Sequence, residues 1–259
     1  MFNFSANTGY LWKELPFLER IKMAKLHGFS SIEFHDEPYL EDTNAIKNLT
    51  TKLELTVNSM NVQKGASFGC AAIPGKTKKA RQEILKGIKI AEDIGAKALH
   101  VLSGINDYDT TSLDTFKSNL KFALENSNIL ILIEPVCSEQ VPGYFLRTIE
   151  QAYSIIKTLN HPRLNIIFDC YHIFKESGNL VENFEAYSEK IGHVQIAAAE
   201  KRAEPFSGQL DYTFLLPQFQ LLGYKGPFGC EYRPANSTED GLGWRDNFSE
   251  TRNGNEAKI

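Results

Sequence analysis

Four oxygen-bearing side chains stand at or near the ends of apolar stretches in the second half of the chain. Glu134 closes "ILILIE", Asp169 closes "NIIFD", Glu231 lies late in "FGCEY", and Gln195 lies within "HVQIA". Carboxylates that converge repel each other and lose hydration, so they need a proton, a basic side chain or a cation. Carboxylate and amide oxygens are hard ligands suited to Mg²⁺ or Mn²⁺. If the stretches converge, these residues predict a divalent-metal site; if they do not, each acid is a helix N-cap or a salt-bridge partner.

The apolar stretches alternate with amphipathic ones along the whole chain. The predicted strands are residues 2–7, 31–35, 55–60, 98–103, 129–134, 165–169, 193–197 and 228–232. The predicted helices are roughly residues 14–27, 42–52, 77–94, 111–126, 146–159, 179–189 and 211–222. This alternation is typical of repeated strand–helix–strand units and a parallel sheet.

Eight strands and at least seven helices in about 250 residues match a single (β/α)8 TIM barrel in count and size. A doubly wound open sheet is the alternative. No G-x-G-x-x-G turn follows the first strand, so no nucleotide cofactor is expected. A barrel presents the C-terminal ends of its strands at one mouth, and Glu33 on the second strand would add a fifth polar group there.

Two regions interrupt the alternation. Residues 61–76 are too long for a plain turn and carry three glycines, so they form either a mobile loop over a site or an ordered surface loop. Residues 245–259 are polar and weakly periodic, and they predict a poorly ordered extension after a catalytic barrel of residues 1–244.

The composition narrows the class of partner. The net charge of −4 arises from 28 basic and 32 acidic residues without long runs, so neither nucleic acid nor a membrane surface is expected as a partner. No apolar run approaches membrane-spanning length, and the N-terminus lacks the features of a secretory signal, which predicts a cytoplasmic location. The four cysteines are far apart and are interpreted as reduced, buried thiols.

Short motifs in a fixed order carry a resemblance to a known family. They read "FSAN", "ELPFLERIKMAKLHGFSSIEF", "AAIPGK", "LIEP", "PGYFL", "DCYHI", "GHVQIA", "GYKGPFGCEYRP" and "EDGLGW". Each motif is short, but their order and spacing together are specific and cover nearly the whole chain to about residue 244. The chain resembles the hydroxypyruvate isomerase family of xylose-isomerase-like barrels.

The resemblance implies a barrel that interconverts an α-hydroxy aldehyde and an α-hydroxy ketone. Carried over by motif, the proton carriers are Glu134 and Glu231, and a divalent metal, Mg²⁺ or Mn²⁺, is held by Glu134, Asp169, Gln195 and Glu231. The residue types fit this chemistry, because a metal stabilises the enediolate formed when a proton leaves the carbon beside a carbonyl. A carboxylate on each side of the substrate can remove or deliver that proton.

Three further residues are candidate substrate contacts. His172 is expected in the loop after the sixth strand, where a neutral imidazole could bond a substrate oxygen. Arg202 in "AEKRAEP" could hold a carboxylate. His100 in "ALHVLS" faces either the substrate or the core. For all three the alternative is ordinary packing or a solvated loop charge.

The family pattern is not followed everywhere, which bears on the substrate. Relatives commonly have an aspartate and a histidine where this chain has Ala198 and Ala203, and the stretch 33–39 is unusually acidic. The first expectation is a small hydroxy-oxo acid, hydroxypyruvate, isomerised to 2-hydroxy-3-oxopropanoate (tartronate semialdehyde). A 2-oxo-tetronate or related sugar-acid isomerase or epimerase is the alternative.

Two other classes of protein stay open. A metal-dependent endonuclease acting on abasic sites shares this barrel, but it would need several histidine ligands and a basic groove. Gln195 and the negative net charge argue against it. A non-catalytic sugar-acid binding barrel would use the same pocket. The sequence does not determine the oligomeric state, and a homo-oligomer stays open.

Overall fold

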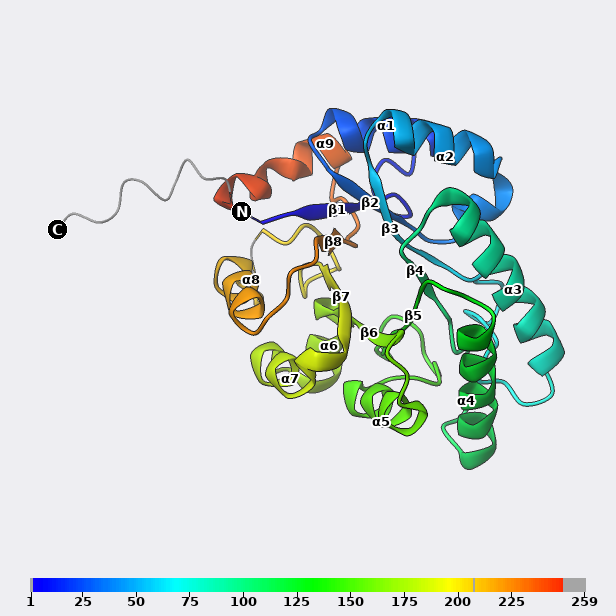
Figure 1. Ribbon diagram of the computed structural model, residues 1–259. Coiled ribbons are helices and arrows are strands. Elements are labelled where there is room, and N and C mark those ends of the chain that lie inside the picture. The colour runs from blue at the N-terminus through cyan, green and yellow to red at the C-terminus, as the bar shows by residue number, and fades with distance from the viewer. Residues whose placement is uncertain (1, 207, 249–259) are drawn as a thin grey trace.

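The strands close into one barrel. In the computed structural model, which describes residues 2–206 and 208–248, eight parallel strands follow one another around a closed sheet in chain order, and β1 pairs with β8. Helices surround this barrel (Figure 1). The predicted (β/α)8 barrel is therefore confirmed, and the doubly wound alternative is wrong because an open sheet would leave its edge strands unpaired.

All predicted strands and helices are present, most with shifted ends, and within the described residues the structure adds two α-helices and three 3-10 helices. The strands are β1 (Phe4–Asn7), β2 (Ser31–Phe34), β3 (Thr56–Asn61), β4 (Ala98–His100), β5 (Leu130–Ile133), β6 (Leu164–Asp169), β7 (Ile191–Ile196) and β8 (Phe228–Cys230). The α-helices are α1 (Phe17–Leu26), α2 (Thr43–Lys52), α3 (Thr77–Ile94), α4 (Thr110–Glu125), α5 (Ile149–Leu159), α6 (Cys170–Ser177), α7 (Leu180–Tyr187), α8 (Tyr212–Leu221) and α9 (Thr238–Gly241). The short 3-10 helices are η1 (Glu37–Leu40), η2 (Ser188–Lys190) and η3 (Leu242–Phe248).

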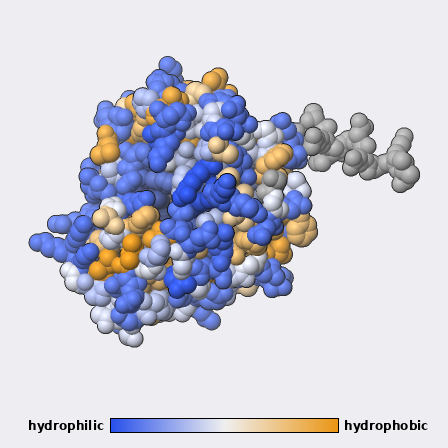
Figure 2. All heavy atoms as spheres, turned by 180° about the vertical axis from the view of Figure 1, so that it is seen from behind, coloured by the Kyte–Doolittle hydropathy of each residue, from blue (hydrophilic) through white to orange (hydrophobic). Residues whose placement is uncertain are grey.

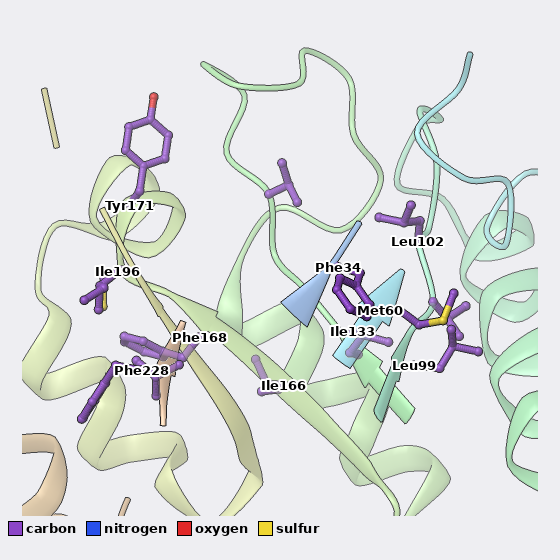
Figure 3. Close-up of a cluster of buried hydrophobic side chains, with 14 of the residues drawn as sticks. Phe34, Met60, Leu99, Leu102, Ile133, Ile166, Phe168, Tyr171, Ile196 and Phe228 are labelled. Atoms are coloured by element: carbon purple, nitrogen blue, oxygen red, sulfur yellow. The ribbon is translucent and has the colours of Figure 1, made fainter. Parts of the chain in front are cut away.

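Alternation along the strands sorts side chains into two layers. Leu99, Ile133 and Phe168 belong to the large apolar core between the barrel and its helices, part of which is shown in Figure 3. Successive strand residues point to opposite faces, so the residues between them point into the barrel. There a separate small apolar cluster forms, made of Ala98, Leu132 and Ile167.

This inner cluster is the floor of the site. Two residues further along the same strands, and hence on the same inner face, stand His100, Glu134 and Asp169. The register also pairs Asp169 with Gln195 on the neighbouring strand. An apolar floor with polar side chains above it at the C-terminal strand ends is where barrel enzymes carry their active sites.

The sequence did not predict α6, and the expectation that His172 lies in a loop is wrong. His172 lies in the first turn of this helix, directly after β6. The helix is only two turns long, too short to show a 3.6-residue period. It begins there because the carboxylate of Asp169 accepts hydrogen bonds from the backbone N–H groups of Tyr171 and His172.

The segment 61–76 is tied to the next strand connection. The backbone N–H of Ala72 donates to the carbonyl of Ser103 at 2.7 Å, and Gly69 forms an isolated bridge with Ser103. Gly69 has a φ of +87°, and a Cβ there would lie 2.4 Å from the carbonyl oxygen of Leu102, so only glycine fits. Of the two alternatives, these bonds favour an ordered loop.

The predicted extension starts inside η3. Phe248 packs edge-on against Phe2 and Phe4, with ring centroids 5.3 and 5.5 Å apart, so residues 245–248 belong to the packed barrel. Residues 249–259 lie outside the described residues. Within the described ranges, no helix is long and apolar enough to cross a membrane, and hydrophilic residues cover most of the face shown in Figure 2.

Candidate active site

Glu134 follows β5 and is buried. Its Oε2 lies 3.6 Å from His100 Nδ1 and its Oε1 lies 3.7 Å from His172 Nε2. Burial, with the charges of Glu231 and Asp169, raises the pKa of Glu134 well above its ordinary value. Glu134 therefore holds a proton more tightly than an exposed glutamate does.

Asp169 is the last residue of β6 and is held ionised. Its Oδ1 caps α6, and its Oδ2 accepts a hydrogen bond from Arg202 Nη2 at 2.5 Å. Burial alone would raise its pKa, but the charges of Arg202 and His172 and the backbone N–H groups of α6 lower it. Two carboxylates of one site therefore have pKa values pushed in opposite directions, which is a pattern of acid–base sites.

Gln195 is oriented by Glu33. Its Nε2 donates to Glu33 Oε1 at 2.9 Å, which leaves the amide oxygen of Gln195 without a hydrogen-bond partner among the described residues. Glu33 also accepts from Asn7 Nδ2 at 3.0 Å, and its Oε2 lies 2.5 Å from His193 Nε2. The expected fifth polar group thus serves as a support for Gln195.

Glu231 follows β8 and faces a histidine that sequence reasoning missed. His35 Nε2 lies 2.8 Å from Glu231 Oε1. Burial would lower the pKa of His35, but the hydrogen bond and charge of Glu231 raise it. The sequence offered one signal for His35: it follows Glu33 by two residues, and side chains two residues apart on a strand point to the same face of the sheet.

Arg202 lies at the centre of the charged groups. Its Nη2 is 2.5 Å from Asp169 Oδ2 and 3.1 Å from Glu231 Oε2, and its Nη1 lies 3.0 Å from His172 Nε2. The guanidinium stacks over the rings of Tyr10 and Tyr171. Arg202 is thus a buried counter-ion of the acids, which a solvated loop charge would not be.

The loop of residues 199–205 carries Arg202 and is called the arginine loop below; its backbone is strained. Lys201 and Arg202 have φ values of 57° and 55°, a left-handed conformation that costs a residue with a Cβ about 1 kcal/mol or more. The carbonyl of Arg202 accepts from the backbone N–H of Arg233 at 2.7 Å. This bond and the ion pairs hold the loop in place.

The two predicted histidines are both buried beside Glu134. Burial lowers the pKa of His172 to about 3, with Asp169 opposing and Arg202 adding to the shift. Burial likewise lowers the pKa of His100 to about 3. Both imidazoles are therefore neutral near pH 7, and His172 Nδ1 lies 3.2 Å from Cys137 Sγ.

A small cavity of about 80 Å³ is lined by some of these groups. Glu134, Glu231, His172 and Arg202 line it. The other lining residues are Tyr10, His35, Asn61, Lys64, Phe68, Leu102, Val136, Gln140, Val141 and Tyr144. Asp169, Gln195 and His100 are not among these lining residues, although Asp169 and His100 are tied to ones that are.

A larger hollow of about 610 Å³ lies elsewhere, between the arginine loop and residues 235–244. Lys201, Glu204 and Trp244 line it, and none of the four predicted metal ligands does. Glu204, two residues after Arg202, accepts a hydrogen bond from the backbone N–H of Ala235 at 2.9 Å. We therefore place the candidate active site in the smaller cavity.

Three of the four predicted ligands carry a buried oxygen suited to a divalent cation, whereas both oxygens of Asp169 already accept hydrogen bonds. Glu134 Oε1, Gln195 Oε1 and Glu231 Oε2 are buried and have no hydrogen-bond partner within the described residues, although Glu231 Oε2 lies near Arg202. Among these residues, one atom each from Glu134, Asp169 and His172 also lies within 4.8 Å of the others. Unsatisfied buried oxygens are costly, and a hard cation would satisfy them.

Glu33 offers a stability prediction with a defined sign. Burial would raise its pKa, but His193 and three hydrogen bonds lower it below the ordinary 4.5. The stability it contributes is therefore present above about pH 4.5 and is lost as the pH falls through the lowered value. We expect Glu33→Gln to reduce the free energy of unfolding by about 2 kcal/mol at pH 7.

Urea unfolding of the variant and the parent at several pH values checks this, and the difference should shrink below pH 4.5. The exposed Glu125, whose ion pair with Lys121 spans 3.9 Å, provides the control variant Glu125→Gln. A difference for Glu33→Gln that grows as the pH falls would contradict the assignment.

The position of the cavity bears on the class of protein. Active sites of (β/α)8 enzymes lie at the C-terminal ends of the strands, and a small cavity lined by charged side chains at that end indicates a site for a small polar molecule. The chain belongs to the xylose isomerase-like TIM barrel family, whose sequence profile matches residues 21–248.

Relatives at similar identity narrow the class further. The chain is 34% identical to the hydroxypyruvate isomerase of Escherichia coli (96% of this chain, 100% of the relative). It is also 34% identical to the 2-oxo-tetronate isomerase of Cupriavidus necator (93% and 96%). A Brucella melitensis structure described as AP endonuclease, family 2, superimposes with a TM-score of 0.92 at 32% identity (96% and 100%). The chain is an isomerase.

Proposed function

We propose that this isomerase interconverts hydroxypyruvate and 2-hydroxy-3-oxopropanoate. The observation that carries the proposal is that Glu134 and Glu231, which follow strands three apart in the barrel order, line the same small cavity. A cavity of about 80 Å³ is far smaller than the several hundred Å³ of a drug-sized pocket, which fits a substrate of three or four carbons.

The proposed reaction moves one carbon-bound proton. A carboxylate removes a proton from C3 of hydroxypyruvate, and the electron pair forms the C2–C3 double bond of an enediolate. A proton is then delivered to C2, and a hydroxyl proton moves between the two oxygens, so atoms and charge balance. Glu134 and Glu231 are the proton carriers, each serving one carbon, so the glutamate that gains a proton releases it to solvent and the other regains one from solvent before the next turnover.

Glu134, Asp169, Gln195 and Glu231 would hold the metal, Mg²⁺ or Mn²⁺. When bound, the ion supplies Lewis-acid stabilisation of the negative charge that develops on the substrate oxygens. The protein's own share is to balance charge with Arg202, which already neutralises part of the charge of Asp169 and Glu231. Neutral His172, which lines the cavity beside Glu134, can bond a substrate oxygen, and His100 supports Glu134 from behind the lining.

A 2-oxo-tetronate is the second candidate substrate, because the relatives named for it and for hydroxypyruvate are equally similar. Endonuclease activity is disfavoured: within residues 2–206 and 208–248 the group able to hold a metal contains a single histidine, whereas a zinc cluster would need several. A non-catalytic binder would bind the acids without exchanging their protons.

The test is a panel of short hydroxy-oxo acids in deuterium oxide, run on metal-stripped protein with and without added Mn²⁺. We expect conversion of hydroxypyruvate or 2-oxo-tetronate, deuterium in the product, and a loss of turnover on chelation that Mn²⁺ restores. Binding of the acids without deuterium incorporation would favour the non-catalytic barrel. Turnover that survives stripping unchanged would sink the metal assignment.

A further inference from the structure

The lining of the active-site cavity includes a lysine that the proton chemistry does not use. Lys64, in the 61–76 loop, lines the cavity together with Glu134 and Glu231. We propose that Lys64 binds the carboxylate of the substrate and so selects hydroxy-oxo acids over uncharged sugars. This inference rests on the proposed function and extends it to the group that recognises the acid.

The loop fixes the position of Lys64 through its backbone. The N–H of Lys64 donates to Asp36 Oδ2 at 3.1 Å, and its carbonyl accepts from the N–H of Gly69 at 2.6 Å. Its ammonium lies 4.0 Å from the centre of the Phe68 ring, which also lines the cavity. The stem is thus held on the rim although the side chain is exposed.

The ammonium of Lys64 forms no ion pair with a carboxylate within the described ranges. Arg202 was expected from the sequence to bind the substrate carboxylate. Its Nη2 already lies 2.5 Å from Asp169 and 3.1 Å from Glu231. An incoming carboxylate at Arg202 would meet two negative charges, whereas one at Lys64 would meet an ammonium that contacts the Phe68 ring and has no ion pair among the described residues.

A second cation lies near the same opening. Arg233 Nη2 donates to Oε1 of Gln140, a cavity-lining residue, at 3.2 Å. Its guanidinium carbon lies 5.9 Å from the centre of the Tyr10 ring, which also lines the cavity. No ion pair of Arg233 is found in the described part of the chain. Arg233 therefore adds positive potential without a competing acid.

The cavity lining thus combines apolar side chains with two acids, Glu134 and Glu231, and the exposed cation Lys64. A hydroxy-oxo acid has a matching shape: its carbonyl and hydroxyl carbons must reach the proton carriers, and its carboxylate is repelled by them. Placing the carboxylate on Lys64 puts like charges apart and opposite charges together. Lys64 then provides specificity for an acid, and Glu134 and Glu231 transfer the protons.

The test compares Lys64→Gln, Lys64→Arg and the parent. A charge-assisted bond of this kind predicts a KM for hydroxypyruvate raised at least about 10-fold in Lys64→Gln, with kcat within about 3-fold, and a near-parental KM in Lys64→Arg. Lys97→Gln is the matched control, because Lys97 is exposed and precedes β4 at the opposite end of the barrel. An unchanged KM in Lys64→Gln would overturn the inference.

Calorimetry with tartronate, a three-carbon hydroxy diacid that cannot isomerise, separates this inference from the proposed function. Tartronate affinity should fall at least about 10-fold in Lys64→Gln and stay parental in Lys97→Gln. If the parent turns over no hydroxy-oxo acid, the proposed function fails, yet weaker tartronate binding in Lys64→Gln would still support the carboxylate site. Equal tartronate affinity in parent and Lys64→Gln would refute it.

Discussion

Replacing Glu134 with glutamine should lower kcat for the best hydroxy-oxo acid by about 10²- to 10⁴-fold, the usual contribution of a positioned acid or base. Glutamine keeps the size of the side chain but cannot carry the proton. The folded protein should not suffer, because the raised pKa of Glu134 means that its ionised form destabilises the fold. Steady-state kinetics and urea unfolding, measured on the same preparation, check both halves.

The control is again Glu125→Gln, which makes the same chemical change on the exposed end of α4 and should leave kcat and stability at parental values. A Glu134→Gln variant that loses stability in step with activity would indicate a packing role. Near-parental turnover would remove Glu134 from the chemistry altogether.

Glu231→Gln should lower turnover by a similar factor, about 10²- to 10⁴-fold. It should block proton transfer at the carbon, C2 or C3, that Glu134 does not serve. If each glutamate serves one carbon, each variant retains proton exchange from one isomer only. One variant should still exchange the C3 protons of hydroxypyruvate with deuterium oxide, and the other should still exchange the C2 proton of 2-hydroxy-3-oxopropanoate. Proton NMR of each isomer with each variant measures this.

The pattern of exchange is the decisive part. If both variants lose exchange from the same isomer, a single glutamate serves both carbons and the other acts through the metal or Arg202. Circular dichroism must show Glu231→Gln folded, since its carboxylate is tied to both His35 and Arg202. Asp211→Asn, which alters an exposed cap of α8, controls for loss of a hydrogen-bonded acid.

Local patterns in the sequence were sufficient to predict the barrel and to place its acids at the C-terminal ends of the strands. Eight short apolar runs alternate with seven amphipathic ones along the chain, and side chains alternate along each strand, so the inward direction of Glu134 and Asp169 follows from the sequence. Their meeting needed only the rule that parallel strands end at one mouth. The helix α6 was missed because a two-turn helix gives too few residues to show a period.

Contacts across the barrel were beyond the sequence. His35 meets Glu231 across 196 positions, and the hydrogen bond between His193 and Glu33 spans 160. Such pairings depend on ring closure and side-chain direction, which no short motif records. Arg202 was singled out by type, but its burial against Asp169 depends on a left-handed loop backbone that its sequence, without glycine, did not indicate.

The apolar floor of Ala98, Leu132 and Ile167 closes the barrel beneath the acids, so entry and exit share one opening. Under the proposed function both isomers carry the same carboxylate and must pass the same lysine. One isomer must leave the cavity before the other can bind. Accumulated product therefore competes with fresh substrate for the same opening. The shared opening does not change the direction of net flux, which the concentrations of the two isomers relative to their equilibrium determine for any catalyst.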